Sequence, residues 1–521
     1  MLQKILQHKK IWSWTAFTLL ALAVSAILHF QSPNLPDSDS FYHFRHAAEY
    51  RERGLFFAEF PWLPLSVVAK FGGDIWYGFH LALIPFTLIQ NEILGIKLAG
   101  IVITAVFLLI CALAFRLLRL RYALALPFAA LFTAPNVIFH LAMTRPHVLT
   151  SSLSLLIFAL VFSAKKSKLW LIGLTAFASA FLHLSLFWLP LLSAMIAIDA
   201  RYLAERKLLW RELISVILGL AIAWLLRPNP IGAAHLVYVQ MFELLAAKLR
   251  GVPLLFGKEL FPLDWGTFGK NFLPFTAVWI WALYLAIKEF FQLKKATTET
   301  NRRALLLGTA IISTAYFLMT MFLARRFYDL WAVFGATLCG LVLAKVRSAN
   351  TNQTYHRNFA AACVIILLLL IPYGFFTHAR SLKTGNDPNE FKEVGLWLKQ
   401  NTPPQTIIYN VYWDIFPKLF FWNPNGRYIR GMDPIFEYSF SEVQYWRGYY
   451  LNTGDTTNVT CPATECAAAD LEDTYEVLTK KFQASYVVVE KSRNAKFYAY
   501  VKSDNRYLPV FESLGQAIFK L

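Results

Sequence analysis

The sequence predicts a polytopic α-helical membrane protein with about eleven transmembrane helices and a C-terminal extracytoplasmic α/β domain. Of the 521 residues, 57% are hydrophobic and only 16% are charged, whereas soluble domains have about 25% charged residues. Runs of about 20 apolar residues recur through the first three quarters of the chain, and each can cross a bilayer as a helix. Backbone groups in lipid must pair within their own segment, which favours helices for all of these runs.

The predicted transmembrane domain extends over residues 1–377 and includes a long external loop at 31–94. Its first apolar run is interpreted as an uncleaved span, because the sequence "HFQSPNLPDSDS" after it has no small-residue cleavage pattern. The predicted spans are residues 11–30, 95–115, 122–139, 148–163, 168–181, 183–199, 212–226, 271–289, 304–321, 329–345 and 359–377.

Positively charged loops predict the orientation of these spans. The segments "QKILQHKK", "RLLRLR", "KKSK", "RYLAERK", "KKATTETNRR" and "KVRSANTNQTYHR" fall on one side, which the positive-inside rule assigns to the cytoplasm. The net charge of +18 is explained by these loops, so no nucleic-acid partner is expected. We therefore expect an integral plasma (inner) membrane protein with a cytoplasmic N-terminus and an extracytoplasmic C-terminal domain.

Residues 76–92 are apolar enough to form a further span. If they crossed the membrane, the basic segment "RLLRLR" would lie outside and the alternation of charge would break. We therefore predict an interfacial or partly inserted helix in the first external loop.

Residues 378–521 are predicted to form the small α/β domain. The runs "QTIIYNVYW" and "ASYVVVEK" are typical of strands, and "YLPVFESLGQAIFKL" is typical of a closing hairpin. The segments "DPNEFKEVGLWLKQ", with Asp387 as its cap, and "DLEDTYEVLTKKF" are predicted helices. A disulfide between Cys461 and Cys466 is an open alternative if this domain is extracytoplasmic.

The unusual polar residues all fall on the predicted external side, as expected if they form one site. They occur in "PDSDSFYHFR" of the first loop, "TRPH" of the second, "GKELFP", "ARRFYD" and the C-terminal "YWDIFP". The residues that these segments supply are Asp37, Asp39, His43, Arg45, Arg145, His147, Glu259, Arg325, Arg326, Trp413 and Asp414.

The aspartates of the first loop have two interpretations. One of Asp37 and Asp39 is expected to cap the helix that starts near Ser40, since Asp accepts backbone N–H bonds there. The other is a candidate divalent-metal ligand or general base at a water-filled membrane edge.

The basic residues also have two interpretations. Arg325 and Arg326 could be snorkelling anchors at a helix end, but adjacent guanidinium forks also match phosphate oxygens. Such a phosphate would most simply belong to a lipid carrier. Arg145 and His147 are open to a structural or a ligand role, and Glu259 is open to a solvated role in its loop.

The segment "DSFYHFR" resembles the GT-C superfamily of membrane glycosyltransferases, which use polyprenyl-linked sugars. The layout is most similar to the catalytic subunits of oligosaccharyltransferases, whose archaeal members tend to show Asp-x-x-Tyr-His-x-Arg here. Asp39, Tyr42, His43 and Arg45 are in register. The resemblance implies that Asp39 binds a divalent metal, Mg or Mn, and helps to activate the acceptor.

Three shorter segments extend the resemblance. "RRFYD" is similar to the family's Arg-Phe-x-x-Tyr, with Leu330 in place of the tyrosine, and implies that Arg326 contacts the donor phosphate. "YWDIFP" is similar to Trp-Trp-Asp-Tyr-Gly, with Tyr412 replacing the first tryptophan, and implies that Trp413 and Asp414 line the acceptor site. Glu259 corresponds to the acidic residue of a late external loop.

One departure concerns the second external loop, "TRPHVLTSS", which lacks the family's acidic motif. His147 could replace a ligand there, so metal dependence stays open.

These observations predict transfer of a sugar or oligosaccharide from a polyprenyl-phosphate-type donor to a protein, glycan or lipid acceptor on the external face. Asp39, Asp37 and Glu259 are the candidate catalytic residues, and Arg326, Arg325 and Arg145 would bind the donor phosphate. Alternatives are a non-catalytic GT-C relative and a transporter or flippase of lipid-linked glycans. Transporters usually have ionisable residues in mid-span and inverted repeats, which this sequence does not show.

Overall fold

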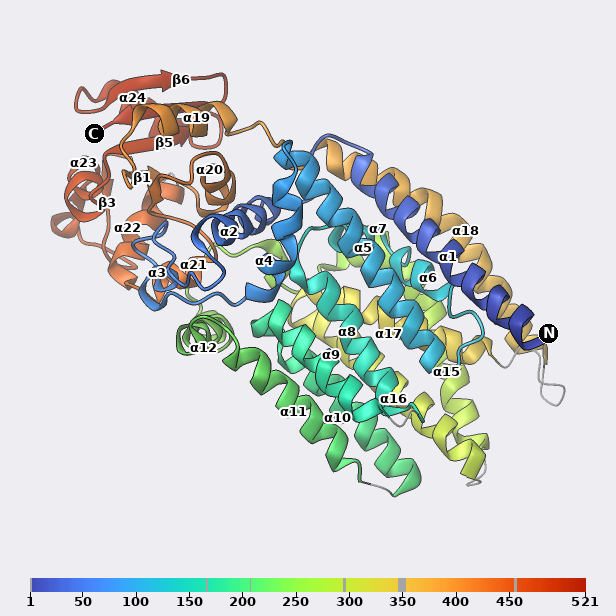
Figure 1. The fold of residues 1–521 in the computed structure, drawn as a ribbon. Helices are drawn as coiled ribbons and strands as arrows, with labels where there is room; N and C mark the ends of the chain where they lie inside the picture. Colours follow the sequence, from blue (N-terminus) through green and yellow to red (C-terminus); the bar gives the residue numbers. More distant parts are fainter. Residues whose placement is uncertain (1, 165–166, 207, 294–296, 345–352, 454–456) are drawn as a thin grey trace. The chain divides into compact units, whose positions relative to one another are not determined.

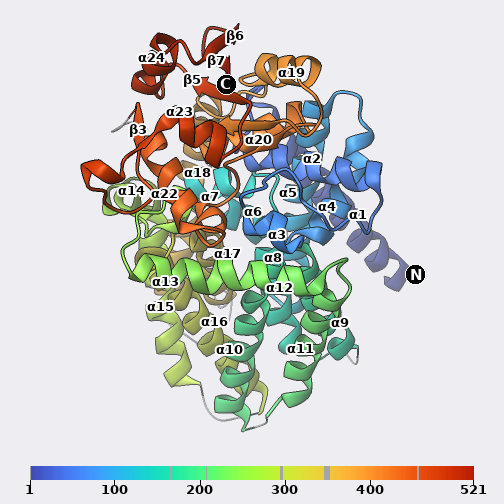
Figure 2. The same ribbon diagram turned by 90° about the vertical axis from the view of Figure 1, so that its left-hand side faces the viewer.

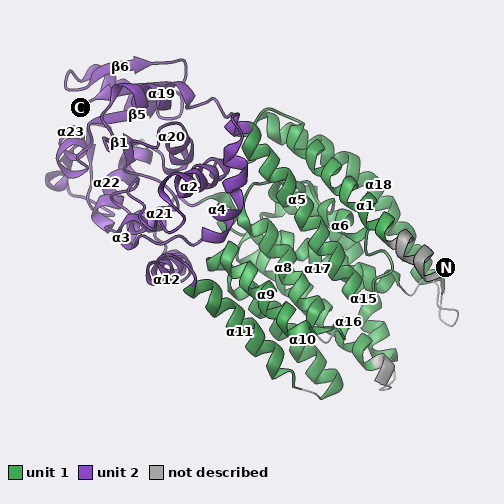
Figure 3. Cartoon of the chain, viewed as in Figure 1, with its two compact units in different colours: residues 1–36, 94–225, 257–385 green, residues 37–93, 226–256, 386–521 purple. Residues whose placement is uncertain are grey.

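The computed structural model describes residues 2–164, 167–206, 208–293, 297–344, 353–453 and 457–521, shown in two views (Figure 1, Figure 2). Four of the predicted basic loops lie partly outside the described residues. The chain forms two compact units (Figure 3). Unit 1 comprises residues 1–36, 94–225 and 257–385, and unit 2 comprises residues 37–93, 226–256 and 386–521.

Unit 1 is a helical bundle. Short helices flank its long ones: η2 (Leu184–Leu186), η4 (Lys258–Leu260), α14 (Trp265–Thr267), η5 (Phe268–Phe272) and η6 (Arg325–Phe327). The main helices are α1 (Leu2–Phe30), α5 (Glu92–Leu117), α6 (Leu126–Leu131), α7 (Pro135–Leu141), α8 (Pro146–Val161), α9 (Lys168–Leu182), α10 (Trp188–Glu205), α11 (Trp210–Leu225), α15 (Leu273–Gln292), α16 (Thr297–Phe322), α17 (Tyr328–Leu343) and α18 (Gln353–Lys383).

The structure confirms a polytopic α-helical membrane protein but changes the number of spans. In the described part of the chain, eight helices are long and apolar enough to cross a membrane, or nine if α7 and α8, bent by 106°, form one broken span. The predicted span at 122–139 is wrong as a single helix, because it is divided into α6 and α7. Helices α9 and α11, with 15 and 16 residues, are shorter than the usual crossing of about 20. Pro230–Leu249 qualifies by length and composition although no span was predicted there.

Helices α9 and α11 pack through their backbones. A Cβ atom added at Gly219 of α11 would lie 2.2 Å from the carbonyl oxygen of Gly173 on α9. Small residues permit this close approach, which is a common basis of helix association in membranes.

We expect Gly219→Ala to destabilise unit 1, because the added methyl group forces the two helices apart. Overpacking of this kind costs about 1–3 kcal/mol, which thermal unfolding of the full chain in detergent would detect as a lowered Tm. Gly269→Ala is the matched control, since a Cβ atom there meets nothing within 4 Å. Equal Tm values for the two variants would contradict this account of the α9–α11 contact.

Unit 2 contains a five-stranded sheet of order β2-β1-β5-β7-β6. β1 pairs in parallel with β2 and β5, whereas β7 is antiparallel to β5 and β6. The predicted strands and the closing hairpin are therefore confirmed. The strands are β1 (Ile407–Asn410), β2 (Arg427–Tyr428), β5 (Tyr486–Glu490), β6 (Leu508–Glu512) and β7 (Gln516–Lys520), with a separate pair β3 (Val459–Thr460) and β4 (Glu472–Asp473).

All three segments of unit 2 contribute helices. They are α2 (Asp39–Arg53), α3 (Val67–Phe71), α4 (Tyr77–Leu83), η1 (Ile84–Leu88), α12 (Pro230–Tyr238), η3 (Val239–Glu243), α13 (Leu244–Leu249), α19 (Lys392–Asn401), η7 (Trp413–Ile415), α20 (Phe416–Trp422), α21 (Pro434–Tyr438), α22 (Glu442–Thr453), η8 (Ala468–Asp470), α23 (Thr474–Glu476), η9 (Val477–Lys481) and α24 (Ala495–Ser503).

One sequence prediction is wrong in unit 2, and the prediction that residues 76–92 do not cross the membrane agrees with the structure. Helix α19 begins at Lys392, and Asp387 instead accepts a hydrogen bond from the backbone N–H of Asn389 in the preceding turn. The segment predicted at 76–92 forms α4 and η1, of seven and five residues, which together are too short to cross a bilayer.

Helix α2 packs against α20, with the rings of Phe41 and Phe421 5.2 Å apart. The first predicted loop is thus part of the same unit as the C-terminal sheet.

Candidate functional site

The first group of polar residues lies in unit 1 and is called the unit 1 cluster. Each member lies at or near a helix end: Arg145 precedes α8, Glu259 lies in η4 and Arg326 lies in η6. Helices α7 and α8 are bent by 106° relative to each other, and the break between them places Arg145 and His147 next to each other at the start of α8. The cluster is His140, Arg145, His147, Glu259, Arg326 and Asp329.

Glu259 is the centre of a basic environment. The Nη1 atom of Arg145 lies 3.1 and 3.4 Å from its two carboxylate oxygens, and the Nη2 atom of Arg326 lies 3.5 Å from Oε1. Burial raises the pKa of Glu259, but Arg145 and Arg326 lower it by more than burial raises it. The pKa of this carboxyl group therefore lies well below its usual range. Two guanidinium groups thus share one carboxylate and keep a net positive charge for a further anion.

Two histidines and an aspartate complete the unit 1 cluster. His140 Nδ1 is hydrogen-bonded to Asp329 Oδ2, and His147 Nε2 lies 3.8 Å from the same oxygen. The two imidazole rings stack with centroids 4.1 Å apart. The Asp329 side chain is only 1% exposed. Sequence analysis missed His140 and Asp329, although an ionisable residue inside an apolar helix is a signal of function.

The two adjacent arginines have different partners. Arg325 lies 3.7 Å from the carboxylate of Asp264 and 3.3 Å from the carbonyl oxygen of Pro262, whereas Arg326 is directed at Glu259. The structure therefore brings Arg145, Arg326 and Glu259 together and places Arg325 on another acidic residue.

In unit 2, Asp37 holds the start of α2. Its Oδ2 atom accepts a hydrogen bond of 3.2 Å from the backbone N–H of Ser40, and its Oδ1 atom accepts one of 2.6 Å from the Ser40 hydroxyl. Asp39 is the first residue of α2 and is half-buried. Of the two aspartates, Asp37 thus has the expected capping role, and the role of Asp39 as base or metal ligand stays a prediction.

Arg45 belongs to a salt-bridge network on α2. Its Nε atom donates to Glu49 at 3.0 Å, and its Nη2 atom donates to Glu52 at 2.8 Å. These pairs are spaced by about one and two helical turns, so they stabilise α2 itself.

His43 belongs to a buried polar network. Its Nδ1 atom lies 2.8 Å from His80 Nε2, and His80 Nδ1 lies 2.6 Å from Asp74 Oδ2. Burial lowers the pKa of the neighbouring His46 to about 3, so that imidazole is neutral. Burial raises the pKa of Asp74, but His80 and His46 lower it below its usual range. Sequence analysis identified His43 but not the residues that hold it.

Trp413 and Asp414 lie in η7, directly after β1. The Asp414 carboxylate forms a two-pronged ion pair with Arg493, with both N···O distances at 3.0 Å. The Arg493 guanidinium also lies 3.6 Å from the centroid of the Tyr412 ring. The segment "YWDIFP" is thus fixed by a residue that follows β5.

Comparisons with known proteins identify the fold. No family model and no curated protein matches the chain. The solved structure of ArnT from Cupriavidus metallidurans in the apo state is similar over 97% of this chain and 98% of that one, with 13% identity and a TM-score of 0.55. The structure of the same protein bound to undecaprenyl phosphate aligns over the same shares, with 14% identity and a TM-score of 0.47. The chain therefore has the fold of ArnT, with membrane helices and a C-terminal sheet domain.

Proposed function

We propose that this chain is a GT-C glycosyltransferase that transfers a sugar or oligosaccharide from a polyprenyl-phosphate-type donor to an acceptor on the external face. The observation that carries the proposal is that Arg145 and Arg326, which lie at the ends of apolar helices, both contact the carboxylate of Glu259. A pair of guanidinium forks at that place suits the phosphate of a lipid carrier. The ArnT-like fold supports the same class of enzyme.

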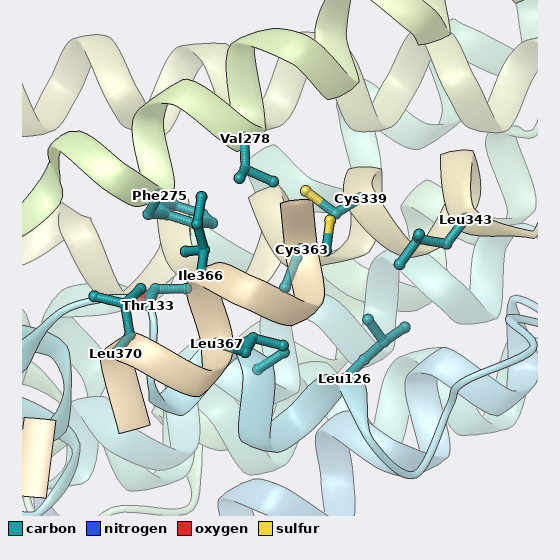
Figure 4. Close-up of a pocket in the computed structure, with 12 residues that line it drawn as sticks. Leu126, Thr133, Phe275, Val278, Cys339, Leu343, Cys363, Ile366, Leu367 and Leu370 are labelled. Atoms are coloured by element: carbon teal, nitrogen blue, oxygen red, sulfur yellow. The ribbon is translucent and has the colours of Figure 1, made fainter. Parts of the chain in front are cut away.

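An apolar pocket in unit 1 suits the lipid part of such a donor. It has a cavity volume of about 70 Å³ and is lined by residues of α6, α15, α17 and α18, including Leu126, Phe275 and Leu367 (Figure 4). Helix α17 also carries Asp329 of the unit 1 cluster in its first turn. One helix therefore contributes to both an apolar cavity and a charged cluster, as an amphipathic lipid phosphate requires.

The proposed reaction is a direct displacement at the anomeric carbon. The acceptor nucleophile loses its proton to Asp39 and forms a bond to that carbon, while the bond from the carbon to the phosphate oxygen breaks. Arg326 and Arg145 offset the negative charge that develops on the leaving phosphate. A divalent ion, Mg or Mn, at Asp39 belongs to this proposal as an aid to the nucleophile.

The orientation is also part of the proposal. The Cys461–Cys466 disulfide, with 5.9 Å between the Cα atoms, suits an oxidising compartment and so supports an extracytoplasmic C-terminal domain. The basic N-terminal segment "QKILQHKK" supports a cytoplasmic N-terminus, and the acceptor would be a protein, a glycan or a lipid.

The test is transfer of labelled sugar in isolated membranes that contain a polyprenyl-linked donor pool. We expect transfer by the unaltered chain, and a loss of about 10²–10⁴-fold in Asp39→Asn, the range that general-base removal gives. Asp387→Asn, an exposed aspartate outside the site, is the control at equal expression. Donor binding without transfer would indicate a non-catalytic relative, and movement of the donor across the membrane without transfer would indicate a flippase.

A further inference from the structure

Two clusters of the same composition occur in the described part of the chain. Each contains two histidines and one aspartate whose ligand atoms all lie within 4.8 Å of one another. One is His140, His147 and Asp329 of the unit 1 cluster, and the other is His46, Asp74 and His80 of unit 2. This residue set matches metal sites, but hydrogen bonding distinguishes a ligand site from a structural network.

The cluster of unit 2 is a hydrogen-bonded network. His80 bonds to Asp74 at 2.6 Å, the Tyr50 hydroxyl donates to the same carboxylate at 2.9 Å, and the Tyr42 hydroxyl lies 3.0 Å from His46 Nδ1. The polar groups of this cluster are thus hydrogen-bonded to one another and to neighbouring side chains, and no bound ligand is needed to account for them.

The cluster of unit 1 has polar atoms without partners. His147 Nε2 and Asp329 Oδ1 are buried and make no hydrogen bond, and their side chains are 10% and 1% exposed. Buried polar atoms almost always have a partner. A cation bound to both groups would supply that partner, and His147 Nε2 is already 3.8 Å from the other oxygen of Asp329.

The surroundings of His140 suit a metal ligand. Its Nδ1 atom contacts Asp329, and its Nε2 atom lies 3.7 Å from Glu259 Oε2. A histidine that binds a metal through one nitrogen commonly directs its other N–H at a carboxylate, which fixes the ring and its tautomer. Glu259 is in position for this second contact.

We propose that His140, His147 and Asp329 bind a divalent transition metal of the zinc class. Two imidazole nitrogens and one carboxylate oxygen match zinc or cobalt, whereas Mg²⁺ and Ca²⁺ prefer oxygen ligands alone. Two ligand atoms that each lie about 2.1 Å from one ion are at most about 4.2 Å apart. The 3.8 Å between His147 Nε2 and Asp329 Oδ2 is within this limit. Any pair of ligand atoms in the cluster that is farther apart, up to 4.8 Å, needs a small side-chain rotation. The ion replaces the proton between His140 and Asp329, and this proton is released to solvent.

The role of this ion rests on the proposed glycosyltransferase function. Three protein ligands leave a position open in a tetrahedral site. A donor phosphate oxygen could take that position beside Arg145 and Arg326, and the ion would then offset the charge of the leaving phosphate. This nitrogen-rich site differs from the oxygen-ligand site for Mg or Mn that the family resemblance implies at Asp39.

The test measures metal binding on the purified full chain in detergent, without donor. The protein is stripped with a chelator, titrated with Co²⁺ and followed by visible absorption, and zinc content is measured by mass spectrometry. We expect one ion per chain, and weaker binding as the pH falls because protons compete for the ligands. His147→Gln and Asp329→Asn should weaken binding by about 10–100-fold or more.

His46→Gln is the matched control, because it removes the same residue type from the hydrogen-bonded cluster of unit 2. It should leave the stoichiometry unchanged. His147→Cys keeps a ligand and should retain zinc, while adding thiolate-to-Co²⁺ absorption, which tests the site even if the glutamine variant folds poorly.

Absence of Co²⁺ binding, or loss of binding in His46→Gln with retention in His147→Gln, would overturn the inference. The outcome is separate from that of the transfer assay. A chain that transfers sugar but binds no cobalt would refute the metal site alone, and a chain that binds cobalt but does not transfer would refute the proposed function alone.

Discussion

Arg326→Ala is expected to lower sugar transfer by about 10²–10³-fold, the usual effect of removing one charge-stabilising donor from a transition state. The reason is that Arg326 and Arg145 face the same carboxylate, so loss of one guanidinium leaves Glu259 to neutralise the other. The phosphate would then lose most of its electrostatic attraction. Initial rates at several concentrations of a defined polyprenyl-linked donor would give kcat/KM for each variant.

Arg325→Ala is the contrast for this experiment. Sequence analysis could not separate the two arginines, but Arg325 faces Asp264 and the carbonyl oxygen of Pro262. We expect a loss of less than about tenfold, corresponding to less than about 1.4 kcal/mol. Equal losses in the two variants would show that the phosphate does not depend on the Glu259-facing guanidinium. Arg326→Lys should recover part of the activity, since lysine keeps the charge but not the fork.

Glu437→Ala is expected to destabilise unit 2 by about 3–5 kcal/mol, the usual cost of leaving one charge of a buried ion pair without its partner. Arg430 is fully buried, and its Nε atom lies 3.1 Å from Glu437 Oε2. Its Nη1 atom also donates to the carbonyl oxygen of Gly448 at 2.8 Å, which holds the charge in place. Thermal unfolding of the full chain in detergent would report the change as a large fall in Tm.

Asp414→Ala provides the control for burial. Its ion pair with Arg493 has good geometry, but the two side chains are 38% and 41% exposed, so its removal should cost about 1 kcal/mol or less. A double variant, Arg430→Met with Glu437→Leu, removes both buried charges and should be more stable than Glu437→Ala. Similar Tm values for the Glu437 and Asp414 variants would be incompatible with this argument.

The local parts of the fold could be predicted from the sequence. β1 and β5 are β-branched and aromatic runs, and the hairpin of β6 and β7 closes through a short turn, so their signals are contained in a few residues. The span predicted at 122–139 is wrong because the segment is apolar enough for one helix but contains prolines that divide it. Pro127 lies in the first turn of α6 and Pro135 begins α7, and proline cannot donate within a helix.

The candidate site shows the same limit. Arg145, Glu259 and Arg326 could be identified because charge beside an apolar run is locally unusual. His140 and Asp329 could not be paired, since they are 189 positions apart in the chain and meet only through the packing of α7 and α17. The sequence therefore revealed the residues at helix ends and left out those that packing brings together.

Unit 2 is built from segments that are synthesised at different times, because it comprises residues 37–93, 226–256 and 386–521. Its α2 emerges from the ribosome early, whereas α20, on which Phe41 packs, belongs to the last segment, 386–521. During translation the apolar face of α2 lacks α20, against which it packs in the folded protein, while unit 1 is still being inserted. A nascent chain that stops before residue 386 would keep Phe41 and Phe44 uncovered. Completion of the C-terminus is thus the step that protects the earliest segment of unit 2 from proteases.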